Sequence, residues 1–331
     1  MNGEFFKIFQ DYQEISVRYD VKHRAVWCYY NPTHRHCYSQ KMLLELRQCQ
    51  QSIIDYFKTR NSDSESPIRY VVQCSKVPGI FNLGGDLELF SNLIKERDRQ
   101  QLLDYATKCI DICYLYSVNM HLPITTITLV EGSALGGGFE AALSSNVLIA
   151  TENAEMGFPE IRFNLFPGMG AYSFLARCCG MGVTERILSS GKIYSARDLY
   201  DKGIVHQLGK SGKGVESAEK YMRSHNYASN GHMALRQIRQ RYNPLDYQEL
   251  LNISELWVDS ALQLRDKDLS LMARLAKAQS EKMTIQNGNA ILRTRQDRRF
   301  LQNEMIFPMK DWSGNSIMVD RRKNQDRRVF H

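Results

Sequence analysis

The sequence predicts an α/β fold, because strand-like and helix-like segments alternate along its front part. Residues 14–22 alternate apolar and polar side chains with a period of two, which is typical of a half-buried strand. Residues 40–58 instead repeat apolar side chains at helical spacing. Residues 124–130 form a short β-branched run that leads into a glycine triplet. Together these observations favour a sheet covered by helices.

The other front elements follow from the same two periodicities, taken in chain order. Short apolar runs bounded by turn residues predict strands over 25–30, 68–74 and 146–151. Apolar positions at helical spacing predict a long helix over 97–120 and a short one over 139–145.

The rear part of the chain changes character. Ser195 and Asp198 have the spacing of a capping box, which marks the start of a helix. From 215 to 283 the apolar positions return at helical spacing without a strand signal. We therefore expect an α/β core with an N-terminal strand extension over residues 1–210. We expect a helical C-terminal region with a basic tail over residues 211–331.

Composition is that of a soluble globular protein and predicts a cytoplasmic location. Of 331 residues, 43% are hydrophobic and 24% are charged. No run approaches ~20 apolar residues, and the N-terminus lacks a basic segment followed by an apolar one, so we expect no membrane span. The eight cysteines include no Cys-x-x-Cys pair and fall in predicted helices and strands. They indicate reduced, buried thiols rather than a disulfide framework.

The net charge of +7 is concentrated near the C-terminus. From Arg293 onward, 10 Lys and Arg stand against 5 Asp and Glu, so +5 of the excess lies there. Two interpretations stay open: a solvated terminal segment, or a docking surface for an acidic partner.

Two glycine turns and two glutamates form the candidate catalytic site. Gly137 lies in the triplet between a predicted strand and a predicted helix, and Gly85 lies in a second glycine turn. Backbone N–H groups at such turns can stabilise an oxyanion. Glu140 lies in the first helical turn and Glu160 follows the next strand, so their carboxyl groups can divide acid and base work beside a carbonyl. The residues leave open which glutamate removes the proton.

Competing motifs are weaker. The Gly-x-Gly-x-x-Ala pattern from Gly136 to Ala141 fits a dinucleotide fingerprint, but its helix is too short for a strand–helix–strand crossover. Residues 132–136 do not read Gly-x-Ser-x-Gly, which argues against a serine hydrolase. His34 and His36 have no matching set of further ligands, so we predict no metal and no cofactor.

Three segments resemble the crotonase (enoyl-CoA hydratase/isomerase) superfamily in order and spacing. They are FNLGGDL at 81–87, VEGSALGGGFE at 130–140, and FPE at 158–160 with PGMGA at 167–171. The resemblance implies a crotonase-like spiral of ββα repeats, and trimers or pairs of trimers formed through the C-terminal helices. It also implies oxyanion donors at Gly85 and Gly137 and catalytic roles for Glu140 and Glu160.

Within that superfamily, the turn at 82–87 and the segment 155–170 are most similar to diffusible signal factor synthases of the RpfF type. This resemblance implies dehydration of a 3-hydroxyacyl thioester on acyl carrier protein, then hydrolysis to a free cis-2-unsaturated fatty acid used in quorum sensing. It implies acyl carrier protein as a partner, a signal receptor or sensor as a possible further one, and no nucleic acid. Residues 31–36 depart from the turn that helps to grip coenzyme A in ordinary hydratases.

Two other functions stay open. One is an enoyl-CoA hydratase or isomerase of fatty acid metabolism. The other is a non-catalytic crotonase-fold protein that binds RNA or protein through its basic tail, although the presence of both glutamates argues against it. For the enzyme, we expect carrier docking at Arg35 and at the cluster 293–299. We expect apolar residues to line the acyl pocket, namely Leu135, Met169, Leu256 and Trp257.

Overall fold

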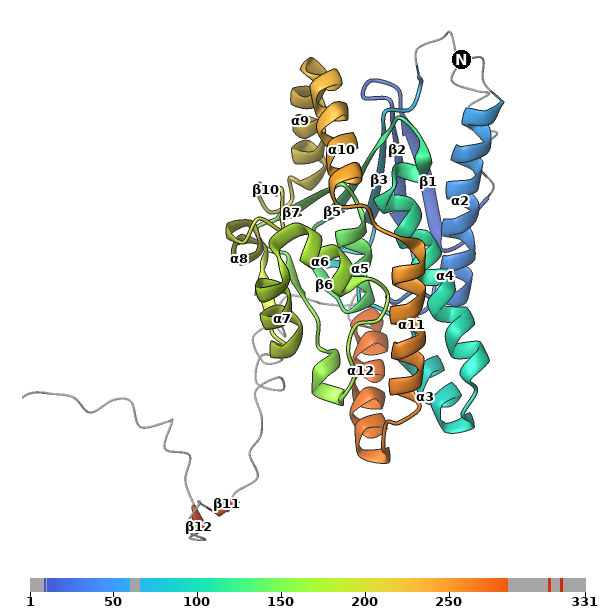
Figure 1. Cartoon of the computed structure of the whole chain (residues 1–331), viewed down its shortest axis with the longest axis vertical. Coiled ribbons are helices and arrows are strands. Elements are labelled where there is room, and N and C mark those ends of the chain that lie inside the picture. The colour runs from blue at the N-terminus through green and yellow to red at the C-terminus, as the bar shows by residue number, and fades with distance from the viewer. Residues whose placement is uncertain (1–8, 10, 60–65, 285–308, 311–315, 318–331) are drawn as a thin grey trace, which may run out of the picture. The chain divides into compact units, whose positions relative to one another are not determined.

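The computed structural model of the chain (Figure 1) describes residues 9, 11–59, 66–284, 309–310 and 316–317. The chain divides into two units, Met1–Met283 and Thr284–His331. In the second unit, the described residues form a short antiparallel strand pair, β11 (Met309–Lys310) and β12 (Ser316–Ile317). All other described elements begin in the first unit.

A six-stranded sheet forms the centre of the first unit, in the order β1-β2-β3-β5-β7-β10. Its strands are β1 (Ile15–Asp20), β2 (Ala25–Tyr30), β3 (Tyr70–Ser75), β5 (Thr125–Val130), β7 (Val147–Thr151) and β10 (Gln207–Gly209). The pair β1 and β2 is antiparallel, and the other neighbouring pairs are parallel. All five predicted strands are present, with ends that differ by one or two residues at most.

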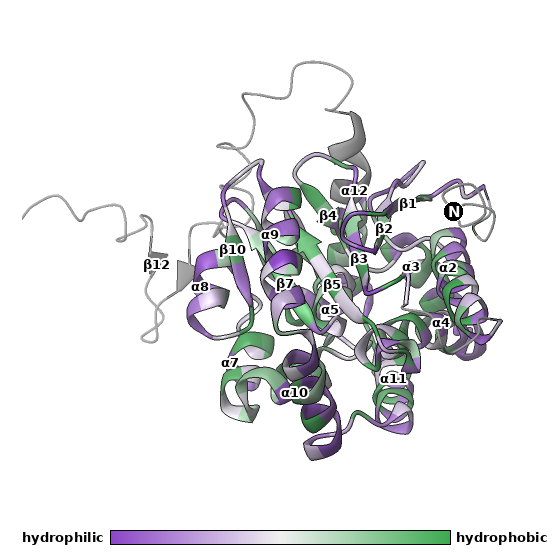
Figure 2. Ribbon diagram, turned by 90° about the horizontal axis from the view of Figure 1, so that it is seen from above, coloured by the Kyte–Doolittle hydropathy of each residue, from purple (hydrophilic) through white to green (hydrophobic). Residues whose placement is uncertain are grey.

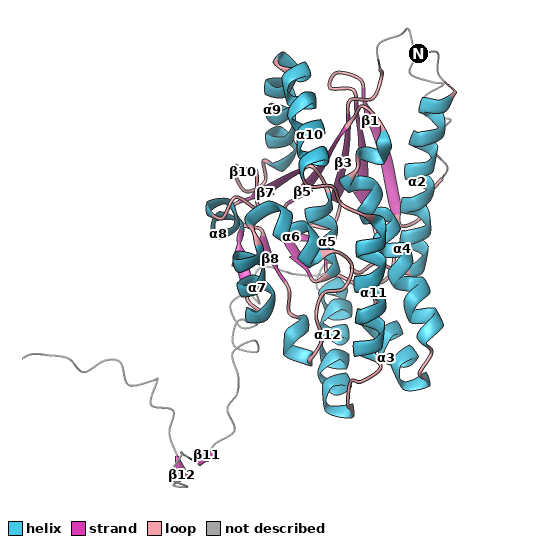
Figure 3. Cartoon of the chain, in the orientation of Figure 1, coloured by secondary structure: helices cyan, strands magenta, loops and turns pink. Residues whose placement is uncertain are grey.

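A second sheet has four short strands in the order β4-β6-β8-β9. They are β4 (Ile80–Asn82), β6 (Ser133–Leu135), β8 (Glu155–Gly157) and β9 (Ile193–Ser195). The first three each follow a strand of the large sheet and precede a helix: α3 (Leu87–Glu96), α5 (Gly137–Ser144) and α6 (Ala171–Cys179). The chain therefore winds as a spiral of ββα repeats (Figure 3), which confirms the expected fold class.

Helices complete the first unit. They are α2 (Gln40–Lys58), α4 (Arg99–Ser117), α7 (Met181–Ser190), α8 (Ala196–Asp201), α9 (Gly214–Tyr227), α10 (Ser229–Tyr242), α11 (Tyr247–Ala261) and α12 (Asp266–Thr284), with 3-10 turns η2 (Asn119–His121) and η3 (Glu160–Phe163). The capping box of Ser195 and Asp198 starts α8 as predicted. The predicted boundary near residue 210 falls inside this unit, because α9 packs on β5, β7 and β10 and α11 packs on α4.

Helices cover both faces of the large sheet. Ile127 and Leu129 of β5 pack with Ala218 and Met222 of α9 on one face, and the opposite face packs against α2, α4 and α5. All six residues of β5 are buried, as expected for a parallel strand between two helical layers. Figure 2 shows hydrophobic colour along much of the central strands, whereas the surrounding helices carry both hydrophobic and hydrophilic residues. Among the described helices, none is long and apolar enough to cross a membrane.

Candidate active site

The two predicted glycine turns lie against each other. They follow β4 and β6, which are parallel neighbours, so both turns leave the same edge of the small sheet. Gly84 has φ +96° and Gly136 has φ +54°, conformations that a residue with a Cβ rarely adopts. A Cβ on Gly137 would lie only 3.3 Å from the backbone nitrogen of Gly85. The structure therefore places the main chain of Gly85 beside that of Gly137.

Gly137 is the first residue of α5, and its N–H makes no hydrogen bond within the described part of the chain. Such an N–H points outward from the positive end of the helix dipole. Gly85 and Gly137 line the same cavity. The geometry thus brings the two predicted oxyanion donors to one place.

Glu140 lies in the first turn of α5 and is only 1% exposed. Its Oε1 accepts hydrogen bonds from the backbone N–H groups of Met169 (2.8 Å) and Ala171 (3.0 Å). Burial raises the pKa of Glu140 to about 7, although both N–H donors act in the opposite direction. A carboxyl group with this pKa can hold or release a proton near neutral pH.

Glu160 is the first residue of η3, which follows β8. The residue is half-buried, but its Oε2 is fully buried and has no hydrogen-bond partner among the described residues. Burial, and then the charge of Glu140, raise the pKa of Glu160 to about 8. Its Oε1 lies where a Cβ of Gly136 would stand, so this glycine makes room for the carboxylate.

Helix α11 supports two parts of the site, the segment at Gly168 and the glycine turn at Gly85. Ser254 Oγ donates a hydrogen bond to the carbonyl oxygen of Gly168 (3.0 Å), and Trp257 fills the space where a Cβ of Gly168 would lie. Trp257 also packs edge-on against Phe90 at 5.1 Å between ring centroids. Phe90 in turn fills the space beside Gly85.

The buried side-chain amide of Gln73 in β3 connects the large sheet to the site. Its Nε2 donates to Thr128 Oγ1 (2.7 Å), to the Ala141 carbonyl oxygen (2.9 Å) and to Ser145 Oγ (3.0 Å). Its Oε1 accepts from the hydroxyl of Tyr30 (2.5 Å). Gln73 therefore links β2, β3, β5 and the helix that carries Glu140.

A small, largely apolar cavity of about 20 Å³ lies next to the glycine turns. Its lining includes Met169 beside the two turn glycines, which makes this the candidate position of the acyl pocket. The remaining lining residues were not predicted; they are Tyr30, Tyr38, Leu43, Cys109, Ile112, Cys113 and Ala141. Three of them recur on one face of α4 at helical spacing, a signal that does not separate a pocket wall from ordinary core.

Three of the four predicted pocket residues do not line this cavity in the described part of the chain. Leu256 is 60% exposed and does not line this cavity, whereas its neighbour Trp257 is buried, so acyl binding by Leu256 stays a prediction without support from this cavity. Trp257 packs against Gly168 and Phe90 and does not line the cavity itself. Leu135 ends β6, and its carbonyl oxygen faces Gly84.

The loop before α2 is fastened to the first glycine turn. The N–H of Tyr38 donates to the Gly84 carbonyl oxygen (2.8 Å), and the N–H of Leu83 donates to the His36 carbonyl oxygen (2.7 Å). Residues 36–38 therefore hold the first glycine turn in place.

Arg35 in the same loop has two acidic partners. Its Nη2 donates to Asp86 Oδ2 (2.8 Å), and its Nη1 pairs with Glu88. These two partners reduce the net charge that Arg35 offers to an acidic carrier protein, and carrier docking at Arg35 stays a prediction. The cluster 293–299, the other predicted docking position, lies outside the described residues.

Comparison with known sequences gives a consistent family. The family model described as "Enoyl-CoA hydratase/isomerase" matches residues 31–263. "Probable enoyl-CoA hydratase 2, mitochondrial" of Arabidopsis thaliana is 31% identical over 187 residues, which are 56% of this chain and 57% of that protein. "Methylglutaconyl-CoA hydratase, mitochondrial" of Homo sapiens is 29% identical over 158 residues, 47% of this chain and 44% of that protein. The chain thus spans about half the length of the curated relatives it matches.

Solved structures share the fold. Enoyl-CoA hydratase from Bacillus halodurans superposes with a TM-score of 0.64 at 17% identity, covering 80% of this chain and 100% of that one. DspI of Pseudomonas aeruginosa gives a TM-score of 0.52 at 19% identity, with 83% and 97% covered. Because the family model matches well over half of the sequence, the chain belongs to the enoyl-CoA hydratase/isomerase family.

Proposed function

We propose that this protein catalyses the reversible removal of water from 3-hydroxyacyl thioesters at the site of Glu140, Glu160 and the two glycine turns. One observation carries the proposal: two carboxyl groups with pKa values raised to about 7 and about 8 lie beside paired turn amides. Near neutral pH such a coupled pair holds about one proton. One glutamate is then a base while the other is an acid.

The proposed reaction follows from these roles. The N–H groups of Gly85 and Gly137 hold the thioester carbonyl oxygen while enolate charge develops on it. The carboxylate takes the proton from C2, and the carboxylic acid gives its proton to the hydroxyl group on C3. The C2–H and C3–O bonds break, the C2=C3 double bond forms and water leaves. Either glutamate fits either role, and hydration is the reverse.

A finer proposal concerns the carrier and the product. We propose acyl carrier protein as the carrier and thioester hydrolysis as a second step, which releases a free cis-2-unsaturated fatty acid. The sequence of 155–170 and the unusual residues 31–36 support this interpretation. A single oxyanion hole can serve both steps, because the enolate and the tetrahedral intermediate place charge on the same oxygen. In the alternative, coenzyme A is the carrier and the reaction ends at the enoyl thioester.

We also propose that the protein assembles as a trimer, or a pair of trimers, through its C-terminal helices. Helix α10 supports this proposal, because its residues Leu235, Ile238 and Tyr242 are 64%, 58% and 88% exposed. Apolar side chains grouped in this way on a surface are typical of an interface.

The substrate test uses 3-hydroxyacyl carrier protein and the matching 3-hydroxyacyl-CoA, with mass spectrometry of thioesters and free acid. An enoyl thioester from either carrier is expected, and free acid formed only from the carrier protein supports the finer proposal. Enoyl-CoA without free acid favours the alternative.

The residue test uses Glu140→Gln and Glu160→Gln, each expected to lower turnover by roughly 10²–10⁴-fold. Glu155→Gln, which changes an exposed carboxylate at the start of β8, is the matched control and should keep wild-type turnover. Normal turnover by both site variants would contradict the proposal.

A further inference from the structure

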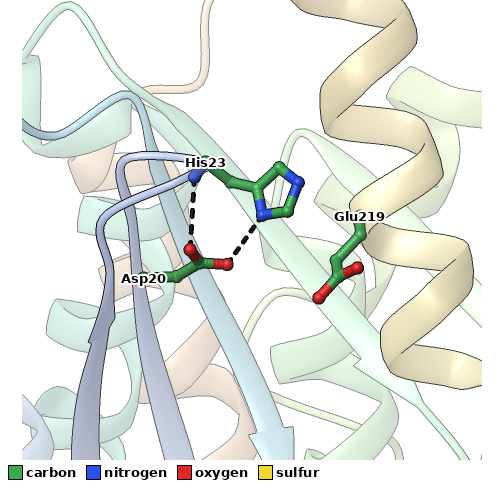
Figure 4. A group of neighbouring side chains, drawn as sticks. All are labelled: Asp20, His23 and Glu219. Carbon is green, nitrogen blue, oxygen red and sulfur yellow. Dashed lines mark hydrogen bonds and ion pairs between the residues drawn. The ribbon is translucent and has the colours of Figure 1, made fainter.

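We propose a divalent metal site, of the kind that takes Zn²⁺, with His23 and Glu219 as ligands and Asp20 as the residue that orients the histidine (Figure 4). One candidate ligand atom from each residue lies within 4.8 Å of those of the other two. Asp20 ends β1, His23 lies in the turn before β2, and Glu219 belongs to α9. None of the three lines the cavity beside the glycine turns, so the proposed site is separate from the catalytic one.

The histidine gives the first reason to expect a ligand. His23 is only 3% exposed, and its Nε2 is buried without a hydrogen-bond partner among the described residues. Figure 4 shows the imidazole ring between the two carboxylates, with Nε2 on the side of α9. A buried ring nitrogen left unpaired is unfavourable, and a metal ion bound there would satisfy it.

Asp20 is placed to orient that ring. Its Oδ2 lies 2.7 Å from His23 Nδ1, and its Oδ1 accepts hydrogen bonds from the N–H groups of Lys22 (2.9 Å) and His23 (3.2 Å). A carboxylate that holds Nδ1–H leaves the lone pair of Nε2 available. Metal-binding histidines commonly have such a carboxylate on the opposite nitrogen.

Glu219 supplies a second negative charge from α9, on the other side of the His23 ring from Asp20 (Figure 4). Its side chain is 30% exposed, and its Oε2 lies 3.5 Å from Arg223 Nη1, a long ion pair at a helical surface. Such pairs contribute little stability, so the carboxylate can turn toward a cation. An imidazole nitrogen with a carboxylate oxygen favours Zn²⁺ over Mg²⁺ and Ca²⁺, and water would complete the coordination.

The proposed ion would fasten the β1–β2 turn to α9. Helix α9 packs across β5, β7 and β10, whereas β1 is the edge strand of the same sheet. A shared ion would therefore join the edge hairpin directly to the helix that covers the centre of the sheet. Its effect is on stability, because an ion that binds only the folded chain raises the unfolding temperature.

The experiment titrates the full chain with Zn²⁺ alone, by calorimetry and by thermal unfolding. We expect one Zn²⁺ bound at this site and a higher unfolding temperature for the wild type. Glu219→Gln should weaken this binding at least ~10-fold and remove the temperature shift, and Asp20→Asn should weaken it by roughly 10–100-fold. The matched control is Glu216→Gln, which removes an exposed, ion-paired carboxylate of the same helix and should bind Zn²⁺ as the wild type does.

Glu219 carries the test because it lies at the surface, whereas replacement of the buried His23 can itself unfold the chain. Zn²⁺ that binds at other histidines or cysteines binds equally to the wild type and to the three variants. The difference between Glu219→Gln and Glu216→Gln therefore reports this site alone. Equal binding by these two variants, or no binding by the wild type, would overturn the proposal. His23 would then serve only as a hydrogen-bonded contact of Asp20.

Discussion

The two sheets of the core contribute different things. The large sheet has strands of up to six residues, and its central strands are buried on both faces by helices. The small sheet has strands of three residues each, yet both glycine turns and η3 with Glu160 follow its strands. Long buried strands stabilise the fold, whereas strands of three residues end in turns whose backbone groups are available to bind a ligand. Stability and proposed chemistry are therefore largely separated in space.

Among substitutions that keep both glutamates, the largest expected effect comes from crowding the small-sheet edge. In Gly136→Ala the new Cβ would occupy the place of Glu160 Oε1 and displace the carboxylate, so turnover should fall by about 10²-fold. Alanine is also strained at φ +54°. Steady-state kinetics and urea unfolding of the same preparation separate these two effects.

Gly203→Ala is the matched control for that strain. Gly203 has φ +73°, and no atom lies within 4 Å of the place that an added Cβ would take, so its replacement costs stability without touching the site. An equal loss of turnover in both variants would show that backbone strain, and not the displaced carboxylate, inactivates the enzyme.

A smaller effect is expected in the pH dependence of stability. The pKa of Glu140 is about 7 when folded and near its ordinary 4.5 when unfolded, so the folded state binds the proton more tightly. The stability that this gives is present below pH 4.5 and is lost as the pH rises through 7. Glu140→Gln should thus exceed the wild type by about 1–3 kcal/mol at pH 9 and match it near pH 4.5.

Urea unfolding at the two pH values measures this difference. Glu155→Gln, with its exposed carboxylate, should show no such pH-dependent gain. A wild type that is as stable as Glu140→Gln at pH 9 would mean that burial does not penalise the ionised form of this glutamate.

The smallest expected effect tests the large sheet. Ile127 is fully buried on the face of β5 covered by α9, so Ile127→Val should lower the free energy of unfolding by about 0.5–1.5 kcal/mol. Turnover per folded molecule should not change, because no described contact joins Ile127 to the site. The same substitution at Ile238, which is 58% exposed on α10, should change neither quantity in the monomer. A large loss of turnover in Ile127→Val would break the separation between the sheets.

The same contrast explains what could be predicted from the sequence. The strands of the large sheet are long enough to show a period or a continuous apolar run, and all five predicted ones are present. Strands of three residues, such as β6 and β8, are too short to show any period. The sequence therefore indicated the fold class but not the second sheet as a separate set of strands.

The site was predicted where side chains or glycines carry the signal. The glycine turns and both glutamates do lie together, as expected from their spacing. The N–H groups of Met169 and Ala171 that hold Glu140 were not predicted, because any residue supplies a backbone donor. The choice between Leu256 and Trp257 depended on the rotation of α11, which an apolar pair at adjacent positions does not define.

The buried amide of Gln73 has a consequence for how the molecule fluctuates. It joins two central strands to the carbonyl oxygen of Ala141 and the hydroxyl of Ser145, at the two ends of the segment that follows Glu140. That segment cannot separate from the sheet without leaving several buried polar groups unpaired. Amide hydrogens of α5 should therefore exchange with solvent only when the whole unit opens, although the neighbouring glycine turns are loops, which usually exchange early.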